Sequence, residues 1–492
     1  MSRIVLVSNR VPARNAGGAQ AGGLAVALNS LLKTQGGLWF GWSGAVCSTP
    51  AATPRQTTDG RITYATVDLS HSEYDGYYNG YSNAVLWPLL HMLPSFEKVY
   101  SNYASAYMMV NRRFAAALAP MLKCDDVIWV QDYHLLALPA ALRALGVRSP
   151  VAVFLHTPFP SAAAIMSVPF ADEAMKGVLE ADLIGFQTEQ DREHFASFAE
   201  SRFGARRGSV NMLRHEGRMI RVGVFPVEID ATEFAAAAGR AGSGRAAGEF
   251  AASLLGRALI LGVDRLDPTK GLPERFDSFR KLLQQKQEWQ GAVTFLQIAA
   301  VSRGDVGTYR SLRRNLEGKA GGINAEFGRP DWTPMRLVTA CQPRDAVAGY
   351  MRKARVGLVT PLRDGMNLVA KEYVAAQDPA DPGVLVLSRF AGAAQQLAAA
   401  LLVNPDDPEE IAEALDAALR MNRTERRRRW QDLWGVIADK SAVKWGLGVL
   451  AATPGFAAAA TGREQAIRNG SDMEIPHYPQ RVVVSLHDRL AG

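Results

Sequence analysis

Two series of short apolar segments occur along the chain, and longer Ala- and Leu-rich stretches of helical pattern lie between them. The short segments are rich in β-branched residues and have no polar face, which is typical of strands buried on both sides of a parallel sheet. Strands that alternate with helices in this way predict an α/β fold with doubly wound parallel sheets. The first series comprises residues 4–8, 127–130, 151–155 and 183–186, and the second comprises residues 259–263, 294–298, 356–360 and 384–387.

Residues 231–248 lie between the two series and consist mainly of Ala and Gly with some Ser and Arg, a composition that favours a connector. We therefore expect two Rossmann-like domains, residues 1–232 and residues 233–455, that face each other across a cleft. Loops at the carboxyl ends of the strands would hold the ligands. The composition changes near residue 456, and the sequence does not indicate a role for the resulting tail, residues 456–492.

The composition is that of an ordinary globular protein, with 48% hydrophobic and 21% charged residues. No apolar run approaches the roughly 20 residues that a membrane-spanning helix needs, and the first residues lack the pattern of a signal peptide. We therefore expect no membrane partner. Three widely separated cysteines, which show neither a disulfide framework nor metal-ligand spacing, favour a reducing, cytoplasmic location: Cys47, Cys124 and Cys341.

The formal net charge is +7, but 48 acidic residues are interleaved with the 55 basic ones. The one basic cluster, residues 426–429, follows Glu425 in a helical pattern and is interpreted as a solvated face. We therefore expect no nucleic-acid partner. A cleft that binds anionic small molecules accounts for a mild positive excess.

Residues that can bind an anion follow the first predicted strand. The strand leads into Asn9 and Arg10, and after a loop the pair Gly22-Gly23 opens a helical pattern. A helix start offers bare backbone N–H groups to an anion, and a guanidinium can grip a phosphate through two parallel hydrogen bonds. The alternative is that the two glycines serve only the bend of the chain.

Charged loops follow three strands of the second series. Arg265 and Lys270 come after residues 259–263, Arg303 comes after residues 294–298, and the charged segment 363–372 comes after residues 356–360. Because parallel strands place their carboxyl ends at one edge of a sheet, these loops predict a ligand site. In the alternative, Arg265 and Lys270 are solvated loop charges that pair with Asp264 and Asp267.

Six sequence motifs are distinctive when taken together. They are Ser8-Asn9-Arg10, Gly-Gly-Leu-Trp-Phe-Gly-Trp-Ser-Gly at residues 36–44, Tyr77-Tyr78-Asn79, Asp132-Tyr133-His134-Leu135, His156-Thr157-Pro158-Phe159-Pro160, and the string at residues 361–373. Together they resemble the motifs of the trehalose-6-phosphate synthase family. This resemblance, which runs from about residue 1 to about residue 450, implies the GT-B fold of two facing Rossmann-like domains. It also implies retaining transfer of glucose from UDP-glucose to glucose 6-phosphate, which gives α,α-trehalose 6-phosphate and UDP.

For the donor, the resemblance implies that Arg265 and Lys270 hold the diphosphate together with the backbone of Gly22 and Gly23. Glu372 would accept hydrogen bonds from the ribose, and Asp364 would bind the donor glucose with His156 close by. Arg265, Lys270, His156 and Asp364 would thus form the catalytic set. Backbone amides would line the nucleotide at four consecutive residues: Leu368, Val369, Ala370 and Lys371.

For the acceptor, the resemblance implies three phosphate ligands, one carboxylate for the sugar hydroxyls and two aromatic walls. These residues are Arg10, Tyr78 and Arg303 for the phosphate, Asp132 for the hydroxyls, and Trp42 and Trp87 for the walls. A sugar suits such a pocket because its hydroxyls bind carboxylates and its apolar face packs on aromatic rings. Alternatives remain: the aromatic residues belong to the core, Asp132 caps a helix over residues 135–145, or His156 is a buried structural histidine.

The resemblance implies a reaction on one face of the sugar, in which the leaving phosphate acts as the base and cations stabilise the diphosphate. The chain has no Asp-x-Asp triplet, the metal-chelating element of the other large glycosyltransferase fold. We therefore expect neither a metal nor another cofactor.

Three positions depart from the family pattern: Gln131 precedes Asp132 where the family commonly has His, Pro268-Thr269 replaces Tyr-Ser, and Glu228 replaces Gly. Two other functions remain as alternatives, a related transferase with another acceptor, such as glycerol 3-phosphate or a pseudo-sugar phosphate, and a sugar-phosphate-sensing subunit of low activity. The donor nucleotide (UDP, GDP or ADP) and the formation of a homo-oligomer are open at this point.

Overall fold

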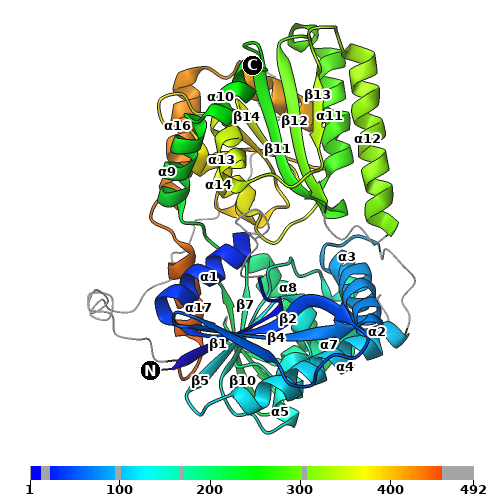
Figure 1. Ribbon diagram of the computed structural model, residues 1–492, viewed down its shortest axis with the longest axis vertical. Helices are drawn as coiled ribbons and strands as arrows, with labels where there is room; N and C mark the ends of the chain where they lie inside the picture. Colours follow the sequence, from blue (N-terminus) through cyan, green and yellow to red (C-terminus); the bar gives the residue numbers. More distant parts are fainter. Residues whose placement is uncertain are drawn as a thin grey trace.

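The computed structural model describes residues 2–12, 23–94, 101–166, 171–209, 211–301 and 307–456. Two α/β units lie one above the other, and each is built around its own sheet (Figure 1). The lower unit in this view contains the N-terminal half of the chain, and the upper unit contains most of the C-terminal half. The predicted α/β class with two sheets is therefore confirmed.

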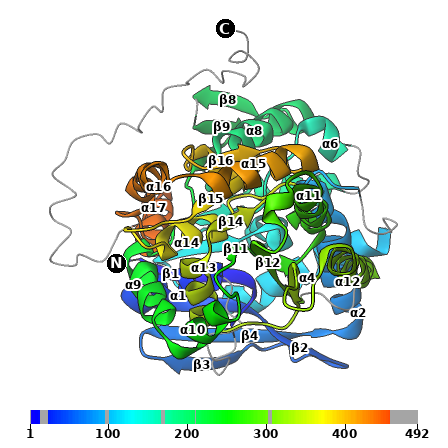
Figure 2. The same ribbon diagram turned by 90° about the horizontal axis from the view of Figure 1, so that it is seen from above.

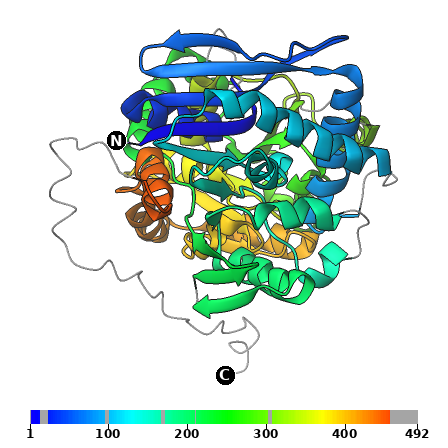
Figure 3. The same ribbon diagram turned by 90° about the horizontal axis from the view of Figure 1, so that it is seen from below.

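The first sheet has ten strands in the order β3-β4-β2-β1-β5-β6-β7-β10-β9-β8. Its centre, from β4 to β10, is parallel, and antiparallel pairs at β3–β4 and β10–β9–β8 close the two edges (Figure 3). The strands are β1 (Arg3–Arg10), β2 (Gly37–Cys47), β3 (Arg55–Asp59), β4 (Ile62–Ser70), β5 (Asp126–Gln131), β6 (Val151–Phe154), β7 (Leu183–Phe186), β8 (Arg206–Ser209), β9 (Met212–His215) and β10 (Arg218–Val224).

Strand β1 shows why this sheet is buried on both faces. Because successive side chains of a strand point in opposite directions, Val5 and Val7 join one core cluster while Ile4 and Leu6 join another. Helices cover the two faces, and a π-helix, η1 (Tyr74–Leu86), carries the predicted Tyr78. The helices of this half are α1 (Gly23–Gln35), α2 (His71–Glu73), α3 (Trp87–Leu90), α4 (Ser101–Leu118), η2 (Ala119–Met121), η3 (Tyr133–Leu135), α5 (Leu138–Ala144), α6 (Ala162–Met166), α7 (Ala171–Val178) and α8 (Glu189–Phe203).

The second sheet has six parallel strands in the order β13-β12-β11-β14-β15-β16. With it, all eight strands predicted from the apolar pattern are present, although several start or end a few residues away from the predicted limits. The strands are β11 (Ala258–Leu266), β12 (Val293–Val301), β13 (Met335–Val338), β14 (Val356–Val359), β15 (Val384–Ser388) and β16 (Leu401–Val403).

Helices pack on both faces of the second sheet (Figure 2). One face is covered by α11 (Leu272–Gln285), α12 (Gly307–Phe327) and α15 (Pro408–Arg420), and the other by α9 (Ala231–Gly242), α10 (Arg245–Ala252), α13 (Arg344–Lys353), α14 (Leu368–Ala376) and α16 (Arg423–Ile437). The second unit also contains three short 3₁₀ helices: η4 (Pro268–Lys270), η5 (Gln287–Trp289) and η6 (Gly392–Gln395).

The prediction of a connector at residues 231–248 is wrong. This segment forms α9 and the start of α10, and α9 buries Ala231, Phe234 and Ala238 in the second core. Alanine has the highest helix propensity of all residues, so an Ala-rich segment becomes a helix once one of its faces can pack. The chain instead crosses between the two sheets at residues 225–230, which contain no helix or strand.

The C-terminal part of the described chain returns to the first sheet. Helix α17 (Ala442–Ala452) packs beside α1, and its Trp445 lies 5.3 Å from the ring of Trp129 on β5 (Figure 1). Residues 442–452 thus lie outside the body predicted as 233–455, because their apolar face completes the core between α1 and the sheet.

No helix within the described ranges is both long and apolar enough to span a bilayer. Residues 457–492 of the predicted tail lie outside the described residues, as do two predicted ligand residues, Gly22 and Arg303.

Candidate functional site

A cavity of about 410 Å³ opens at the carboxyl ends of the strands of the second sheet, where the two units meet. The first unit and the crossover contribute His156, Gln187 and Val227 to its wall. The second unit contributes the predicted donor residues Arg265, Lys270, Asp364, Leu368, Val369 and Glu372. The structure therefore brings together most of the predicted donor residues in one cavity, as expected for an open α/β sheet.

The loop that carries Lys270 is held rigidly at the end of β11. The Asp267 carboxylate accepts a hydrogen bond from the backbone N–H of Thr269 at 3.0 Å, which caps the short helix η4. Gly271 then adopts φ +62°, and a Cβ at this position would lie 2.4 Å from the backbone oxygen of Thr360. Only glycine fits there, so the turn leads directly from Lys270 into α11.

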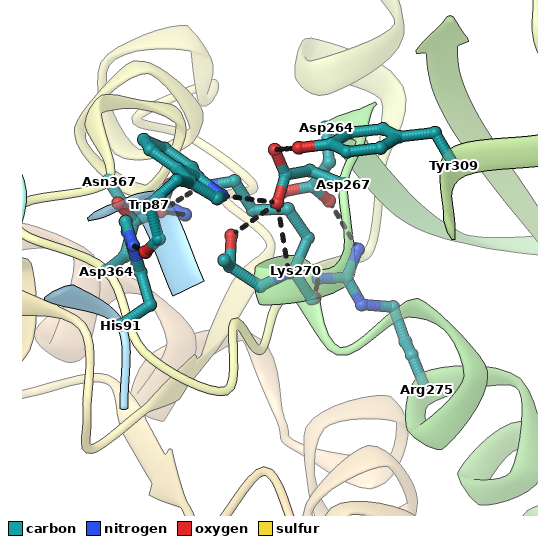
Figure 4. Close-up of polar contacts among 10 residues, drawn as sticks. Trp87, His91, Asp264, Asp267, Lys270, Arg275, Tyr309, Asp364 and Asn367 are labelled. Atoms are coloured by element: carbon teal, nitrogen blue, oxygen red, sulfur yellow. Dashed lines mark hydrogen bonds and ion pairs between the residues drawn. The ribbon is translucent and has the colours of Figure 1, made fainter. Parts of the chain in front are cut away.

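Arg275 fixes the same loop from below. Its fully buried guanidinium forms an ion pair with Asp264 at 2.6 Å and donates to the backbone oxygen of Lys270 at 3.2 Å (Figure 4). The role of this arginine was not predicted, because its partners are brought together only when α11 packs on the sheet.

Lys270 forms an ion pair with Asp364, which also accepts a hydrogen bond from the side chain of Asn367 at 3.1 Å (Figure 4). Burial, the largest single effect, would raise the pKa of Asp364, but the groups around it, above all the Lys270 ammonium and, less strongly, Arg265, together hold that pKa below its ordinary value. The site thus presents an ionised carboxylate beside a cation. A carboxylate of this kind can accept hydrogen bonds from sugar hydroxyls, and the ammonium can neutralise a phosphate.

The alternative in which Asp264 and Asp267 neutralise the loop cations is wrong for Lys270. Asp264 pairs with Arg275, and Asp267 accepts hydrogen bonds from the indole N–H of Trp87 at 3.2 Å and from the Tyr309 hydroxyl at 3.1 Å. Trp87 belongs to the first unit, so Asp267 links the two sides of the cleft (Figure 4). The roles of Asp267 and Tyr309 were missed, since no local pattern reveals such a partner.

Arg265 lies on the Trp87 ring, with its guanidinium carbon 5.7 Å from the ring centre. This distance allows a cation–π interaction, so one predicted donor cation rests on one predicted acceptor wall. The centre of the buried His91 ring lies 4.1 Å from that of Trp87, and burial lowers the pKa of His91 to about 4. His91 is therefore a neutral support of the wall.

Helix α14 begins beside Asp364 and places its first turn in the cavity. Asn367, at φ +71°, turns the chain into Leu368, and the N-terminal turn of a helix offers N–H groups and a positive dipole to an anion. On the same helix, Glu372 lies 3.6 Å from the guanidinium of Arg344, and burial raises the pKa of Glu372 against the opposing effect of Arg344. Arg344 was missed, because it follows a strand that the apolar pattern did not predict.

His156 is half-buried and forms part of the cavity wall. Its Nε2 lies 2.9 Å from Oε1 of Gln131, and its Nδ1 lies 3.5 Å from Nε2 of Gln187. Burial lowers the pKa of His156 to about 3, so the ring is neutral at physiological pH. The alternative of a buried, hydrogen-bonded histidine and the predicted place beside the donor are therefore both compatible with the structure.

Asp132 lies next to His156 in an unusual conformation. It is one of the few described non-glycine residues with a left-handed backbone, at φ +69°, and its Oδ1 accepts from the backbone N–H of His156 at 3.1 Å. Strain of this kind concentrates at functional sites. The helix-cap alternative is wrong, since α5 starts at Leu138 and is preceded by Ala137 as its cap.

Three predicted acceptor residues form one cluster in the first unit. The guanidinium carbon of Arg10 lies 5.7 Å from the ring centre of Trp42, whose ring lies 5.3 Å from that of Tyr78. The ring of His134, which was missed, stacks on Tyr78 at 6.0 Å. Arg10 and Tyr78 thus both contact the Trp42 ring, and a cation and a phenol are groups that can bind a phosphate monoester.

Of the predicted glycine pair, Gly23 is the first residue of α1 and Gly22 lies outside the described residues. Arg303 also lies outside them, in the loop that follows β12. Among the residues that the structure describes, no group of three or more His, Cys, Asp or Glu side chains is arranged to hold a metal ion.

Comparison with known proteins covers both units and the cleft. The profile of Glycosyltransferase family 20 matches residues 4–452. A trehalose-6-phosphate synthase of Sinorhizobium fredii is 44% identical over 449 residues, which are 90% of this chain and 97% of that protein.

Two similar solved structures contain ligands. One, an α,α-trehalose-phosphate synthase (UDP-forming) from Burkholderia xenovorans in complex with glucose-6-phosphate, has a TM-score of 0.87, 42% identity and coverage of 91% of this chain and 98% of that one. The other, from Escherichia coli and described as bound with UDP-2-fluoro glucose, has a TM-score of 0.86, 41% identity and coverage of 92% and 98%. The two sheets therefore have the GT-B arrangement, and the chain belongs to glycosyltransferase family 20.

Proposed function

We propose that this chain is a UDP-forming trehalose-6-phosphate synthase, which transfers glucose from UDP-glucose to glucose 6-phosphate. The carrying observation is the pairing of Lys270 with Asp364 in the wall of the cavity between the two units, while Arg10, Trp42 and Tyr78 form a cluster in the first unit. The relatives supply the substrates, since one similar structure contains glucose-6-phosphate and another a UDP-glucose analogue. We assign the donor to the second unit and the acceptor to the first.

In the donor subsite, the diphosphate lies against Arg265 and Lys270, and the first turn of α14 offers backbone N–H groups to the nucleotide. Glu372 accepts from the ribose hydroxyls, while Asp364 accepts from the hydroxyls of the donor glucose. His156, being neutral, packs near that sugar without adding charge. In the acceptor subsite, Arg10, Tyr78 and Arg303 bind the phosphate, Asp132 binds hydroxyls, and Trp42 and Trp87 line the sugar.

The proposed reaction takes place on one face of the donor sugar and retains its configuration. The acceptor hydroxyl oxygen forms the new bond to the anomeric carbon as the bond from that carbon to the diphosphate oxygen breaks. The hydroxyl proton passes to the departing diphosphate, so atoms and charges balance. The protein contributes positioning, and its cations stabilise the negative charge that develops on UDP.

The decisive experiment is a matrix of donors and acceptors on the purified protein. UDP-, GDP- and ADP-glucose are each combined with glucose 6-phosphate, glucose and glycerol 3-phosphate, and both the released nucleotide and the linkage of the product are measured. The proposal requires UDP-glucose with glucose 6-phosphate to give the α,α-linked product and UDP. Preference for glycerol 3-phosphate supports the related transferase instead, and a lack of turnover with every pair supports a sensing subunit.

Removal of Arg10 is expected to weaken the acceptor selectively. Arg10→Ala should raise the Michaelis constant for glucose 6-phosphate about 10- to 150-fold, since a charge-assisted hydrogen bond is worth about 1.5–3 kcal/mol. The constant for UDP-glucose should change far less, and Arg303→Ala should behave in the same way. Steady-state kinetics with each substrate varied in turn checks this, and Arg61→Ala, on the exposed turn between β3 and β4, is the control. A selective loss of UDP-glucose binding would contradict the assignment of subsites.

Treatment with a chelator is expected to leave most of the activity, because Arg265 and Lys270 supply the positive charge at the leaving group. Activity is measured after dialysis against EDTA, with and without added Mg²⁺ or Mn²⁺. Loss that either ion restores would show that a metal takes part. Metal independence is therefore part of the proposal. A cytoplasmic location is also part of it, and it rests on the wide spacing of the three cysteines.

A further inference from the structure

The crossover between the two units contains a buried carboxylate. Residues 225–230 join β10 to α9, and the Glu228 side chain in this segment is only 9% exposed. Its neighbours Val227 and Ile229 are also buried. A charged residue is rarely buried in a connecting segment unless it is paired, so its partners indicate what it does.

Both oxygens of the Glu228 carboxylate are engaged by side chains of the second unit. Lys371, which is fully buried, donates from Nζ to Oε2 at 2.7 Å and also to the backbone oxygen of Val227 at 2.7 Å. Gln396 donates from Nε2 to Oε1 at 3.1 Å. One ammonium and one amide thus bind two consecutive residues of the crossover.

These two partners belong to the elements that frame the donor subsite. Lys371 lies in the first turn of α14, directly before Glu372. Gln396 directly follows η6, where the backbone N–H of Gly392 donates to Asp364 O at 3.1 Å and that of Ala393 donates to Met366 O at 2.8 Å. Glu228 therefore connects to both sides of the segment that carries Asp364.

The other side of the crossover is bound to the first unit. The backbone N–H of Val227 donates to Oε1 of Gln187 at 3.0 Å, and Nε2 of Gln187 lies 3.5 Å from the ring of His156. A continuous series of contacts thus runs from α14 through the crossover to His156. Segments that join two domains commonly absorb the motion by which a cleft closes on its substrates.

We infer that Glu228 is a positioning residue that fixes the crossover to α14 and η6 and thereby sets the place of the donor subsite relative to His156. The inference rests on the proposed function. A glycine at this position would have no side chain with which to bind Lys371 or Gln396. A buried ion pair is weak evidence for stability but is able to specify one arrangement of two packed parts.

The test compares variants of this pair by steady-state kinetics and by calorimetric titration with UDP. Glu228→Gly, which removes the side chain, should raise the Michaelis constant for UDP-glucose and the dissociation constant of UDP by about tenfold or more. The free energy of a tenfold change is only a part of what the loss of one partner of a buried ion pair costs. The Michaelis constant for glucose 6-phosphate should change less than that for UDP-glucose, because Arg10 and Tyr78, two of its three proposed phosphate ligands, lie within the first unit.

Glu228→Gln is the conservative variant and should retain most of the donor affinity. Its amide oxygen can accept from Lys371, and its N–H₂ group can donate to Oε1 of Gln396, a buried atom with no hydrogen bond within the described residues. If Glu228→Gly fails to fold, Glu228→Asp takes its place, because the shorter side chain withdraws the carboxylate from both partners.

The control for a purely structural effect is Asp182→Asn. Asp182 forms an ion pair with Arg143 at 2.7 Å on the far side of the first unit. The Asp182→Asn substitution should lower the melting temperature without changing the ratio of the two Michaelis constants. The inference would be overturned if the Glu228 variants changed both Michaelis constants equally. It would also be overturned if their affinity for UDP were unchanged while the wild type is active. A wild type that shows no transfer from UDP-glucose would instead overturn the proposed function.

Discussion

Turnover of the Lys270→Ala variant is expected to fall by about 100- to 1,000-fold at saturating substrates, with the fold intact. The reason is that a preorganised charge aimed at a developing anion is worth about 2.7–4 kcal/mol in the transition state. Lys270 is well placed for this, because η4, Gly271 and Arg275 hold its backbone. The measurement is the rate of UDP release together with the circular dichroism spectrum and the melting temperature.

A second effect of the same substitution must be separated from the first. Without the Lys270 ammonium, Asp364 remains buried without its cation, and burial then raises the pKa of this carboxyl. If Lys270 served only to keep Asp364 ionised, any requirement for it should disappear in an Asp364→Asn background. We expect instead that Lys270→Ala also lowers the residual turnover of Asp364→Asn.

A suitable control is Lys281→Ala, which removes a lysine from the surface pair with Glu409 on α11 and α15. Exposed pairs of this kind contribute about 0.2–1 kcal/mol, so the turnover of the control should match that of the wild type. Near-wild-type turnover of Lys270→Ala itself would remove this lysine from the mechanism.

Eight of the sixteen strands in the described ranges could be predicted from the sequence, because their residues are mainly apolar on both faces. In β15, Val384 and Val386 pack on one face while Leu385 and Leu387 pack on the other, so no polar position interrupts the run. Such a pattern is typical of a strand that is buried on both faces, as at the centre of a parallel sheet. The exposed edge strand β3 and the short β13 have no such run, and they were not predicted.

Partner choice in the site could not be predicted, because it depends on contacts between residues far apart in the sequence. The loop after β11 showed two carboxylates and two cations, and pairing within the loop was the simplest alternative. The structure pairs Lys270 with Asp364, in the loop after β14, and uses Asp267 to bind Trp87 of the first unit. The partners of each charged side chain are determined when the two units pack, and the local spacing of residues does not indicate them.

The family motifs nevertheless predicted which residues share the cleft. Arg265, Lys270, Asp364 and Glu372 line one cavity with His156, as the resemblance implied. Their individual roles stay predictions that the substitutions above test. The role of residue 228 could not be deduced from the motifs, since Lys371 had been expected to contribute only its backbone.

Gly365→Ala is expected to lower the turnover number divided by the Michaelis constant for UDP-glucose by about 100-fold or more. A Cβ at this position would lie 1.9 Å from the backbone oxygen of His156, whereas side-chain carbons essentially never approach closer than 3.0 Å. The segment that carries Asp364 and Gly365 would therefore have to move away from His156 by about 1 Å. A displacement of that size in an active site can cost about 100-fold in rate. Because β14 and β6 fix the two backbones in different sheets, neither can yield without moving its unit.

The variant should still fold. The turnover number divided by the Michaelis constant should fall for both substrates, because the substitution separates the two subsites without removing a ligand group. Gly239→Ala on α9 is the matched control, because a Cβ there meets no atom within 4 Å and alanine favours a helix. The measurement is steady-state kinetics for both substrates combined with thermal unfolding of both variants. Wild-type kinetics for Gly365→Ala would show that the contact between the donor segment and His156 is not maintained during turnover. The close approach of the two units at this glycine would then have no part in catalysis.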